Sequence, residues 1–158
     1  MSQYHPVRFV DVRLEGDFWK ERLDTVLART IPSQHKKLVE YGYLDSLKLP
    51  SPPPPLRFPR HANGFTVQVF WDSDVGKWIE AASYSLIHHP NAQLEADIDA
   101  VVELIAGTQD DDGYIDTYFQ MMAPERRWTD FAMGHEMYCG GHLIEGAEIG
   151  RASCRERV

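Results

Sequence analysis

The sequence predicts an all-α fold, and within that class part of an antiparallel α/α toroid. Apolar residues recur at helical spacing in several stretches of the 158-residue chain. A minimal turn, residues 88–91, joins two of the predicted helices, whereas a long excursion, residues 108–129, precedes the next. Short turns at one end and long loops at the other suit a toroid, and its functional site is then expected at the long-loop end.

The N-terminal segment combines an extended stretch with a helix. Loose alternation over Val7–Leu14 predicts a short strand or an extended segment. Gly16 and Asp17 then offer a cap for a helix that runs to about Leu27. Pro32 predicts a break or kink, after which the helix resumes over residues 33–41 and ends at Gly42.

Residues 43–71 contain a long Pro-rich loop. The prolines of residues 50–59 exclude a regular helix and favour polyproline geometry. A linker between domains is one interpretation. A loop that lies over the fold is favoured because much apolar surface follows, from Phe58, Phe65, Val67, Val69, Phe70 and Trp71.

Two further helices follow in close succession. The first is predicted to begin at a cap, Asp72 or Ser73, and to stop before Pro90. The second covers residues 94–105 and ends at Gly107.

A third helix is predicted near the C-terminus. Apolar residues at helical spacing indicate at least one buried stripe, made by Phe131, Tyr138, Leu143, Ile144 and Ala147. The same stretch holds an unusual number of glycines, at positions 134, 140, 141 and 146. Each glycine costs up to about 1 kcal/mol against alanine in a helix. Close helix packing, a nearby ligand or an irregular helix start would explain them.

Composition narrows the class of protein. The net charge of −8 argues against nucleic acid as the main partner. No apolar run approaches the roughly 20 residues of a membrane span, so no membrane association is predicted. The N-terminus lacks the basic start and apolar stretch of a signal peptide, and a cytoplasmic location is expected. Two cysteines, Cys139 and Cys154, form neither a disulfide framework nor a complete zinc site.

The last ten residues differ from the rest of the chain. Residues 149–158 are rich in arginine, poor in core residues and similar to what a reading frame of a common sequencing adapter would encode. We therefore expect residues 1–148 to form the natural domain and residues 149–158 to be a non-native tail. A natural charged tail with a frayed helix is the alternative.

Two motifs place polar and aromatic side chains at the expected long-loop end. Asp72 and Asp74 begin a helix, where they either complement the helix dipole or hydrogen-bond the hydroxyl groups of a sugar. Tyr114 lies in the long loop with Tyr118 and Phe119, and such rings either stack on sugars or pack inside a tight turn. The acidic residues before Tyr114 do not follow the spacing of an EF-hand.

A third motif, residues 135–142, carries the most reactive side chains. His135, Cys139 and His142 are spaced to share one helix face, which would allow a zinc site. The zinc-peptidase motif requires histidine where Cys139 stands, so no metal site is predicted here. A hydrogen-bonded His135 beside a small core cysteine is the simpler interpretation.

Taken together, these motifs resemble glycoside hydrolase family 127. The resemblance rests on Phe70-x-Asp-Ser-Asp-Val-x-Lys-Trp-x-Glu-Ala, Gln109-x-x-Asp-Gly-Tyr-x-Asp-Thr, Arg127-Trp and His135-Glu-Met-Tyr-x-x-Gly-His-x-Ile-Glu. Their order and spacing are similar to the start of that family's catalytic domain, over nearly all of residues 7–147.

The resemblance implies the N-terminal part of an (α/α)6 barrel. It also implies a parent enzyme that releases L-arabinofuranose from β-linked arabinofuranosides with retention, using a zinc-held cysteine nucleophile and a glutamate acid/base. Those residues are expected downstream, so this fragment is expected to hold no catalytic or metal-binding residue, to be inactive and to self-associate.

Four residues are the candidate substrate-binding groups. His135 matches a family histidine that contacts the sugar, while Asp72, Asp74 and Tyr114 are placed near the pocket by the loop argument alone. A non-catalytic helical scaffold or sugar-binding domain is the alternative function. A small zinc hydrolase that uses residues 135–142 is a third possibility.

Overall fold

The computed structural model describes residues 4–48 and 64–155. Within these ranges all regular elements are helical, which confirms the all-α prediction for this part of the chain. The longer helices are α1 (Asp17–Thr25), α2 (Ile31–Glu40), α4 (Trp71–His88), α5 (Ala92–Ala106) and α7 (Glu136–Arg155). Two short helices, α3 (Tyr43–Ser46) and α6 (Thr117–Met122), lie in the connections.

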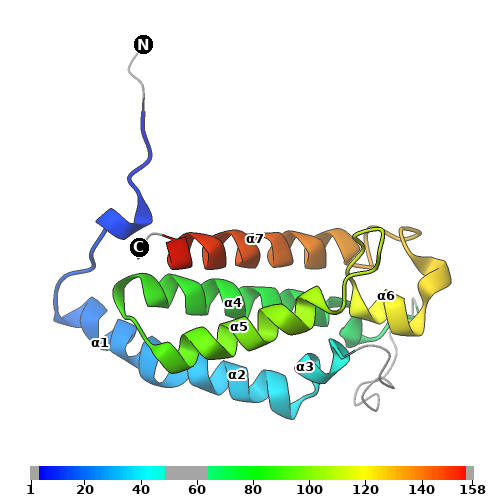
Figure 1. Ribbon diagram of the computed structural model, residues 1–158, viewed down its shortest axis with the longest axis horizontal. Coiled ribbons are helices and arrows are strands. Elements are labelled where there is room, and N and C mark those ends of the chain that lie inside the picture. Colours follow the sequence, from blue (N-terminus) through cyan, green and yellow to red (C-terminus); the bar gives the residue numbers. More distant parts are fainter. Residues whose placement is uncertain (1–3, 49–63, 156–158) are drawn as a thin grey trace.

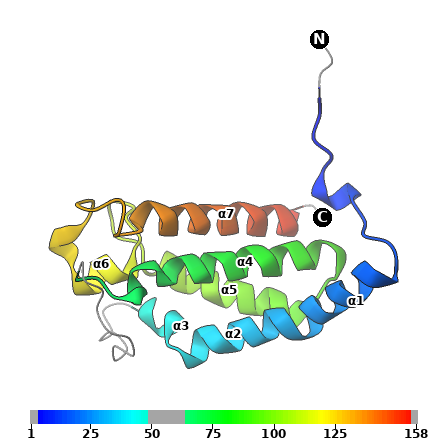
Figure 2. The same cartoon turned by 180° about the vertical axis from the view of Figure 1, so that it is seen from behind.

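The helices alternate in direction. Figure 1 shows α4 and α7 running side by side in one direction, while α1–α2 and α5 run in the other. Helix α4 packs against α2, α5 and, most extensively, α7. Both views place α3, α6, the start of α4 and the loop before α7 at one end, with the α4–α5 turn at the other (Figure 1, Figure 2). This arrangement suits part of an α/α barrel and has the predicted long-loop end.

The N-terminal strand prediction is wrong. Phe9–Asp11 forms a single 3-10 turn, closed by the Asp11 amide donating to the Arg8 carbonyl at 3.0 Å. A strand needs a neighbouring strand to pair its backbone groups, and no strand occurs in residues 4–48 or 64–155. Of the Pro-rich loop predicted over residues 43–71, residues 49–63 lie outside the described residues. The described ends of this range contain the short helix α3 and a 3-10 turn over Val67–Phe70.

The break predicted at Pro32 is only a local widening of the helix. Residues Val26–Thr30 form a π-helical turn between α1 and α2, which ends two residues before Pro32. Pro32 has no N–H to donate to the preceding turn, and a wider turn accommodates this missing hydrogen bond. Gly42, at φ 82°, ends α2 as predicted.

Helices α4 and α7 approach each other through glycines. A Cβ added at Gly76 would lie 2.6 Å from the His142 carbonyl oxygen, and one at Gly146 would lie 2.8 Å from the Gly76 oxygen. Close packing therefore explains both residues. Open space surrounds Gly140 and Gly141, so helix packing does not explain these two.

The buried stripe predicted on α7 is wrong. Tyr138 is 44% exposed and Ile144 is 71% exposed, while Phe131 precedes the helix in an exposed turn. The buried face instead holds the small residues Cys139 and Gly146. Because small residues allow the two backbones to approach, the face that carries them turns inward and the larger side chains turn outward.

The buried side chains form two clusters. The first, which we call the apolar core, lies mainly between α2, α4 and α5 and includes Ile31, Leu38, Val75, Trp78, Ile79, Leu86, Ile98 and Val101. The second packs the long-loop end with Phe65, Val69, Tyr114, Tyr118, Phe119 and Ala123. The long loops are therefore held against the helices. None of the helices in the described ranges has the length and apolarity of a membrane span.

Candidate functional site

Asp72 anchors a neighbouring helix instead of capping its own. The N-cap of α4 is Phe70, so the cap predicted at Asp72 or Ser73 is wrong. Asp72 is 2% exposed, and its carboxylate accepts hydrogen bonds from the Thr117 backbone N–H and hydroxyl, both at 2.7 Å. Thr117 begins α6, so the carboxylate lies at a helix N-terminus where negative charge is favourable.

A second buried carboxyl group, Asp116, lies beside this contact. Its Oδ1 caps α6 by accepting from the Phe119 N–H at 3.2 Å, while its Oδ2 is shielded from solvent and has no hydrogen-bond partner. Burial and the charge of Asp72 raise the pKa of Asp116 to about 8. Burial also raises the pKa of Asp72, despite the two bonds from Thr117. Asp116 therefore carries a proton at neutral pH.

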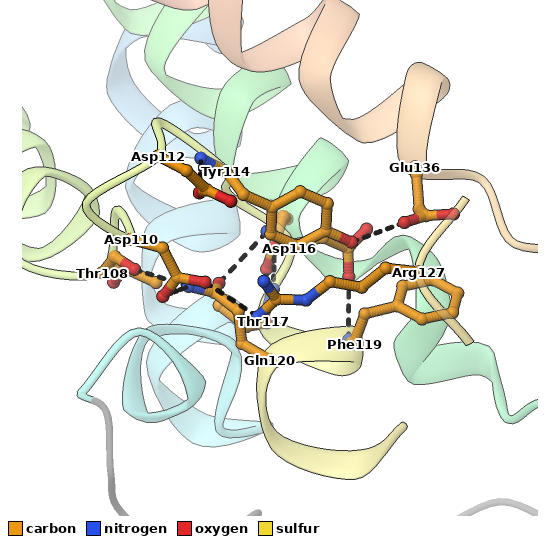
Figure 3. Close-up of polar contacts among 11 residues, drawn as sticks. Thr108, Asp110, Asp112, Tyr114, Asp116, Thr117, Phe119, Gln120, Arg127 and Glu136 are labelled. Atoms are coloured by element: carbon orange, nitrogen blue, oxygen red, sulfur yellow. Dashed lines mark hydrogen bonds and ion pairs between the residues drawn. The ribbon is translucent and has the colours of Figure 1, made fainter. Parts of the chain in front are cut away.

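Glu136, at the start of α7, ties two loop residues to that helix. Its carboxylate accepts from the Tyr114 hydroxyl at 2.5 Å (Figure 3). It also accepts from the Trp128 backbone N–H at 2.8 Å. Arg127 lies over the Tyr114 ring at 4.1 Å and pairs with Asp110 at 2.8 Å. Burial and the bond to Glu136 raise the pKa of Tyr114, so its hydroxyl remains a donor.

The long excursion before α7 is folded on itself. Gln120 donates from Nε2 to the Thr108 carbonyl at 2.7 Å and to Asp110 at 2.8 Å (Figure 3). Asp112 accepts from the Tyr114 backbone N–H at 3.0 Å, next to a turn at Gly113 with φ 89°. Three aromatic rings of this segment are buried, namely Tyr114, Tyr118 and Phe119, whereas Trp128 is exposed. This geometry favours the tight turn with packed rings.

His135 is held in an unusual backbone conformation immediately before α7. Its φ is 58°, a region that non-glycine residues rarely adopt, and its carbonyl accepts the N–H of Cys139 at 2.8 Å. The Nδ1 atom lies 2.9 Å from the Met133 carbonyl, which can only accept, so Nδ1 carries the hydrogen. In the neutral ring, Nε2 therefore keeps its lone pair. The ring is half-buried between those of Phe70 and Tyr138.

A rim of partly exposed side chains joins Asp74 to this histidine. Lys77 pairs with Asp74 at 3.1 Å, and its ammonium lies 4.8 Å from the centre of the Tyr138 ring. The Tyr138 ring lies 5.8 Å from that of His135. Partial burial lowers the pKa of Lys77, but hydrogen bonds to Tyr138 and Asp74 outweigh it, and the net pKa is raised. Asp74 and Lys77 also line a cavity of about 370 Å³ between α2 and α4.

The structure thus places the four predicted site residues in two layers. Asp72 and Tyr114 are buried beneath the long loops, whereas His135 and Asp74 lie on the rim. The sequence analysis missed residues in both layers, namely Asp116 and Glu136 below and Lys77 and Tyr138 above. Helical spacing would have found the last two, three positions after Asp74 and His135, but burial of the two carboxyl groups has no local signal.

Cys139 does not fit a zinc site. Its side chain is fully buried, and Sγ donates to the Val69 carbonyl at 3.6 Å. Burial raises the pKa of this thiol, so it stays protonated, whereas zinc binds the thiolate. His135, Cys139 and His142 do not form a metal-binding group among the described residues. Cys139 is therefore not the zinc-held cysteine that the resemblance implies for the parent enzyme.

Comparisons with known proteins agree on one family. Residues 11–155 match the family described as β-L-arabinofuranosidase, GH127 catalytic domain. A non-reducing end β-L-arabinofuranosidase from Bifidobacterium longum subsp. longum is 34% identical over 160 residues, which cover 87% of this chain. A GH127 β-L-arabinofuranosidase from Geobacillus stearothermophilus T6 superimposes with a TM-score of 0.78 at 33% identity over 90% of this chain. A second solved structure, a GH127 β-arabinofuranosidase, superimposes with a TM-score of 0.78 at 34% sequence identity over 94% of this chain.

These matches span only part of each relative. The aligned region covers 23% of the Bifidobacterium enzyme, and 22% and 24% of the two solved structures. The chain thus corresponds to somewhat less than a quarter of each of these proteins. With the match to the family extending over most of its residues, the chain belongs to glycoside hydrolase family 127.

Proposed function

We propose that the complete protein releases L-arabinofuranose from β-linked arabinofuranosides, with retention of configuration. The family match over residues 11–155 carries this proposal, and the names of the relatives support the substrate class. Retaining hydrolysis needs an acid/base and a nucleophile on opposite sides of the glycosidic bond. We place both groups, and the zinc expected beside the nucleophile, outside these 158 residues.

His135 is the direct sugar contact in this proposal. Its Nδ1 is engaged by the Met133 carbonyl, and Nε2 is left to accept a hydrogen bond from a sugar hydroxyl. Asp74 is a second contact on the same rim, since its carboxylate is partly exposed. The Lys77 ammonium beside it neutralises its charge and keeps it in place.

Asp72 and Tyr114 serve the same site from below. Both oxygens of Asp72 are engaged by Thr117, and the Tyr114 hydroxyl is engaged by Glu136. Direct sugar binding by either group would require these bonds to open. Their contribution in this proposal is to hold α6 and the loop before α7, and thereby to fix the position of His135.

The test uses the complete enzyme with an aryl β-L-arabinofuranoside. Replacing His135 with Ala is expected to lower kcat/KM at least tenfold, equivalent to about 1.4 kcal/mol. His135→Asn is the matched variant, because Asn tolerates positive φ and keeps a polar group there. His89→Ala, exposed in the α4–α5 turn at the opposite end, is the control. Unchanged kcat/KM in both His135 variants would remove His135 from the substrate site.

The same assay separates the enzyme from a scaffold. A catalytically silent complete protein would favour the non-catalytic helical domain, whereas turnover by the purified 158-residue chain would contradict our placement of the catalytic groups.

We also propose that residues 149–158 are non-native. The arginine-rich composition supports this, although α7 continues to Arg155 and helix continuity therefore does not mark the boundary. Sequencing the source gene across codon 148 tests it, and an unbroken natural frame through codon 158 would refute it.

A further inference from the structure

We propose that Glu80, His142 and Glu145 form a binding site for a divalent transition-metal ion of the zinc type. Each offers one ligand atom, and these atoms lie within 4.8 Å of one another. The function proposed above uses none of the three, although all stand in the motif segments of the sequence. This site is independent of that function, and it differs from the cysteine-containing group considered earlier.

The helix geometry assembles this group. His142 and Glu145 are three residues apart on α7, so they share one face of that helix. Glu80 faces them from α4, at the place where the backbones come together. A Cβ at Gly76 would lie 2.6 Å from the His142 carbonyl oxygen, so α4 and α7 are in backbone contact one turn before Glu80. This close approach of the two helices brings the three side chains within reach of one another.

The charge balance of the group favours a cation. Two carboxylates at this separation repel each other when both are ionised. Among the described residues, neither Glu80 nor Glu145 pairs with a Lys or Arg. Lys77, one turn away on α4, is engaged by Asp74 at 3.1 Å. A bound divalent ion would supply the missing positive charge.

The imidazole of His142 adds a second observation. Its Nδ1 is shielded from solvent and makes no hydrogen bond, although a Glu145 oxygen lies 3.2 Å away. The Tyr138 ring packs edge-on against the imidazole at 4.7 Å and restricts its rotation. The neutral imidazole nitrogen beside the Glu145 carboxylate can donate its lone pair to a metal ion that both side chains bind.

The donor set selects the class of ion. One imidazole nitrogen and two carboxylates are typical zinc ligands, and three protein ligands leave a fourth position for water. Calcium and magnesium prefer six or more oxygen ligands, which this group does not provide. The Glu145 side chain is 61% exposed, so the ion would exchange with solution. By joining α4 to α7, it would stabilise the folded chain.

The experiment measures zinc binding to the chelator-treated 158-residue chain by calorimetry and thermal unfolding. We expect one zinc per chain, and a rise in Tm of about 3–6 °C at tenfold excess over Kd. His142→Ala and Glu80→Gln are each expected to weaken binding at least tenfold. The control His89→Ala, exposed on the α4–α5 turn, retains wild-type affinity.

Cobalt(II) provides a spectroscopic check on the ligands. Nitrogen and oxygen ligation predicts visible d–d bands without a thiolate charge-transfer band. A thiolate charge-transfer band that disappears in Cys139→Ala would instead assign the ion to Cys139, and it would overturn the proposal. Wild-type affinity in His142→Ala and Glu80→Gln would do the same, as would equal binding of magnesium. Circular dichroism confirms folding, and the near-isosteric Glu80→Gln keeps the test decisive if His142→Ala unfolds.

Discussion

The apolar core and the long-loop end are built from different interactions. Between α2, α4 and α5 a cluster of buried apolar side chains packs together, and the Trp78 indole donates to the Ile31 carbonyl at 3.2 Å. At the long-loop end, buried carboxyl groups at Asp72, Asp116 and Glu136 hold the loops in place. The core depends on the area removed from water, whereas the loop end depends on the direction of each hydrogen bond.

Backbone strain follows the same division. The non-glycine residues with positive φ in the described part of the chain, Trp128 and His135, both lie at the long-loop end. Glu136 accepts from the Trp128 N–H, and it directly follows His135. Strained residues persist where the surroundings over-determine them, and they cluster at functional sites. We therefore expect stability to depend mainly on the apolar core and the geometry of the proposed site on the long-loop end.

The largest expected effect is in the core. Replacing Trp78 with Ala removes an almost fully buried ring that also stacks on His35 at 4.6 Å. We expect a loss of about 3–5 kcal/mol in the free energy of unfolding, because a large cavity remains. Urea denaturation of the 158-residue chain measures it. Trp78→Phe is the matched variant and is expected to lose less. A loss below about 1 kcal/mol in Trp78→Ala would show that α2 and α4 do not form the stabilising core.

The second effect is a pH dependence that arises at the loop end. The pKa of Asp116 is about 8 in the folded chain, against an ordinary value of 3.8, so between these limits the folded state holds a proton that the unfolded state has lost. Stability therefore falls as pH rises through this window, with a slope of up to about 1.4 kcal/mol per pH unit. Asp116→Asn retains the cap on α6 and is expected to flatten the slope.

The slope is measured from the free energy of unfolding, which urea denaturation gives at a series of pH values between about 5 and 8. Asp111→Asn, exposed in the same excursion, is the control and is expected to leave the slope unchanged. An equal slope in the wild-type and Asp116→Asn chains would show that this carboxyl is not protonated in the folded state.

The smallest expected effect concerns strain at His135. His135→Gly removes the steric cost of positive φ, which is about 1–2 kcal/mol, but gives the unfolded chain more freedom. We expect the stability to change by less than about 1 kcal/mol, while the complete enzyme loses activity. The opposite substitution, Gly42→Ala, is the control. Because φ is 82° at Gly42, we expect it to lower the free energy of unfolding by about 1 kcal/mol. If His135→Gly destabilises more than Gly42→Ala, the imidazole supports the fold and not the site.

Much of the helical framework could be predicted from the sequence. The end of α4 before Pro90 and the end of α5 at Gly107 follow from local backbone chemistry. The start of α4 does not, because its N-cap is Phe70 and not Asp72 or Ser73. The position of the long-loop end could be predicted from the lengths of the connections between helices. Which side of α7 is buried could not be predicted, because its apolar residues indicate one face and its glycines another. Only the partner helix decides between them.

The longer helices and the family could be recognised from residue spacing and motif order, because both are properties of neighbouring residues along the chain. Which side chains meet depends on how the helices pack. Asp72 reaches Thr117 on α6, and Glu80 comes near His142 only because glycines let α4 and α7 approach. Such contacts depend on the distance between packed helices, and a single added Cβ at a contact glycine would increase that distance. A one-dimensional pattern contains the residues that allow this approach, but the distances arise only when the helices pack.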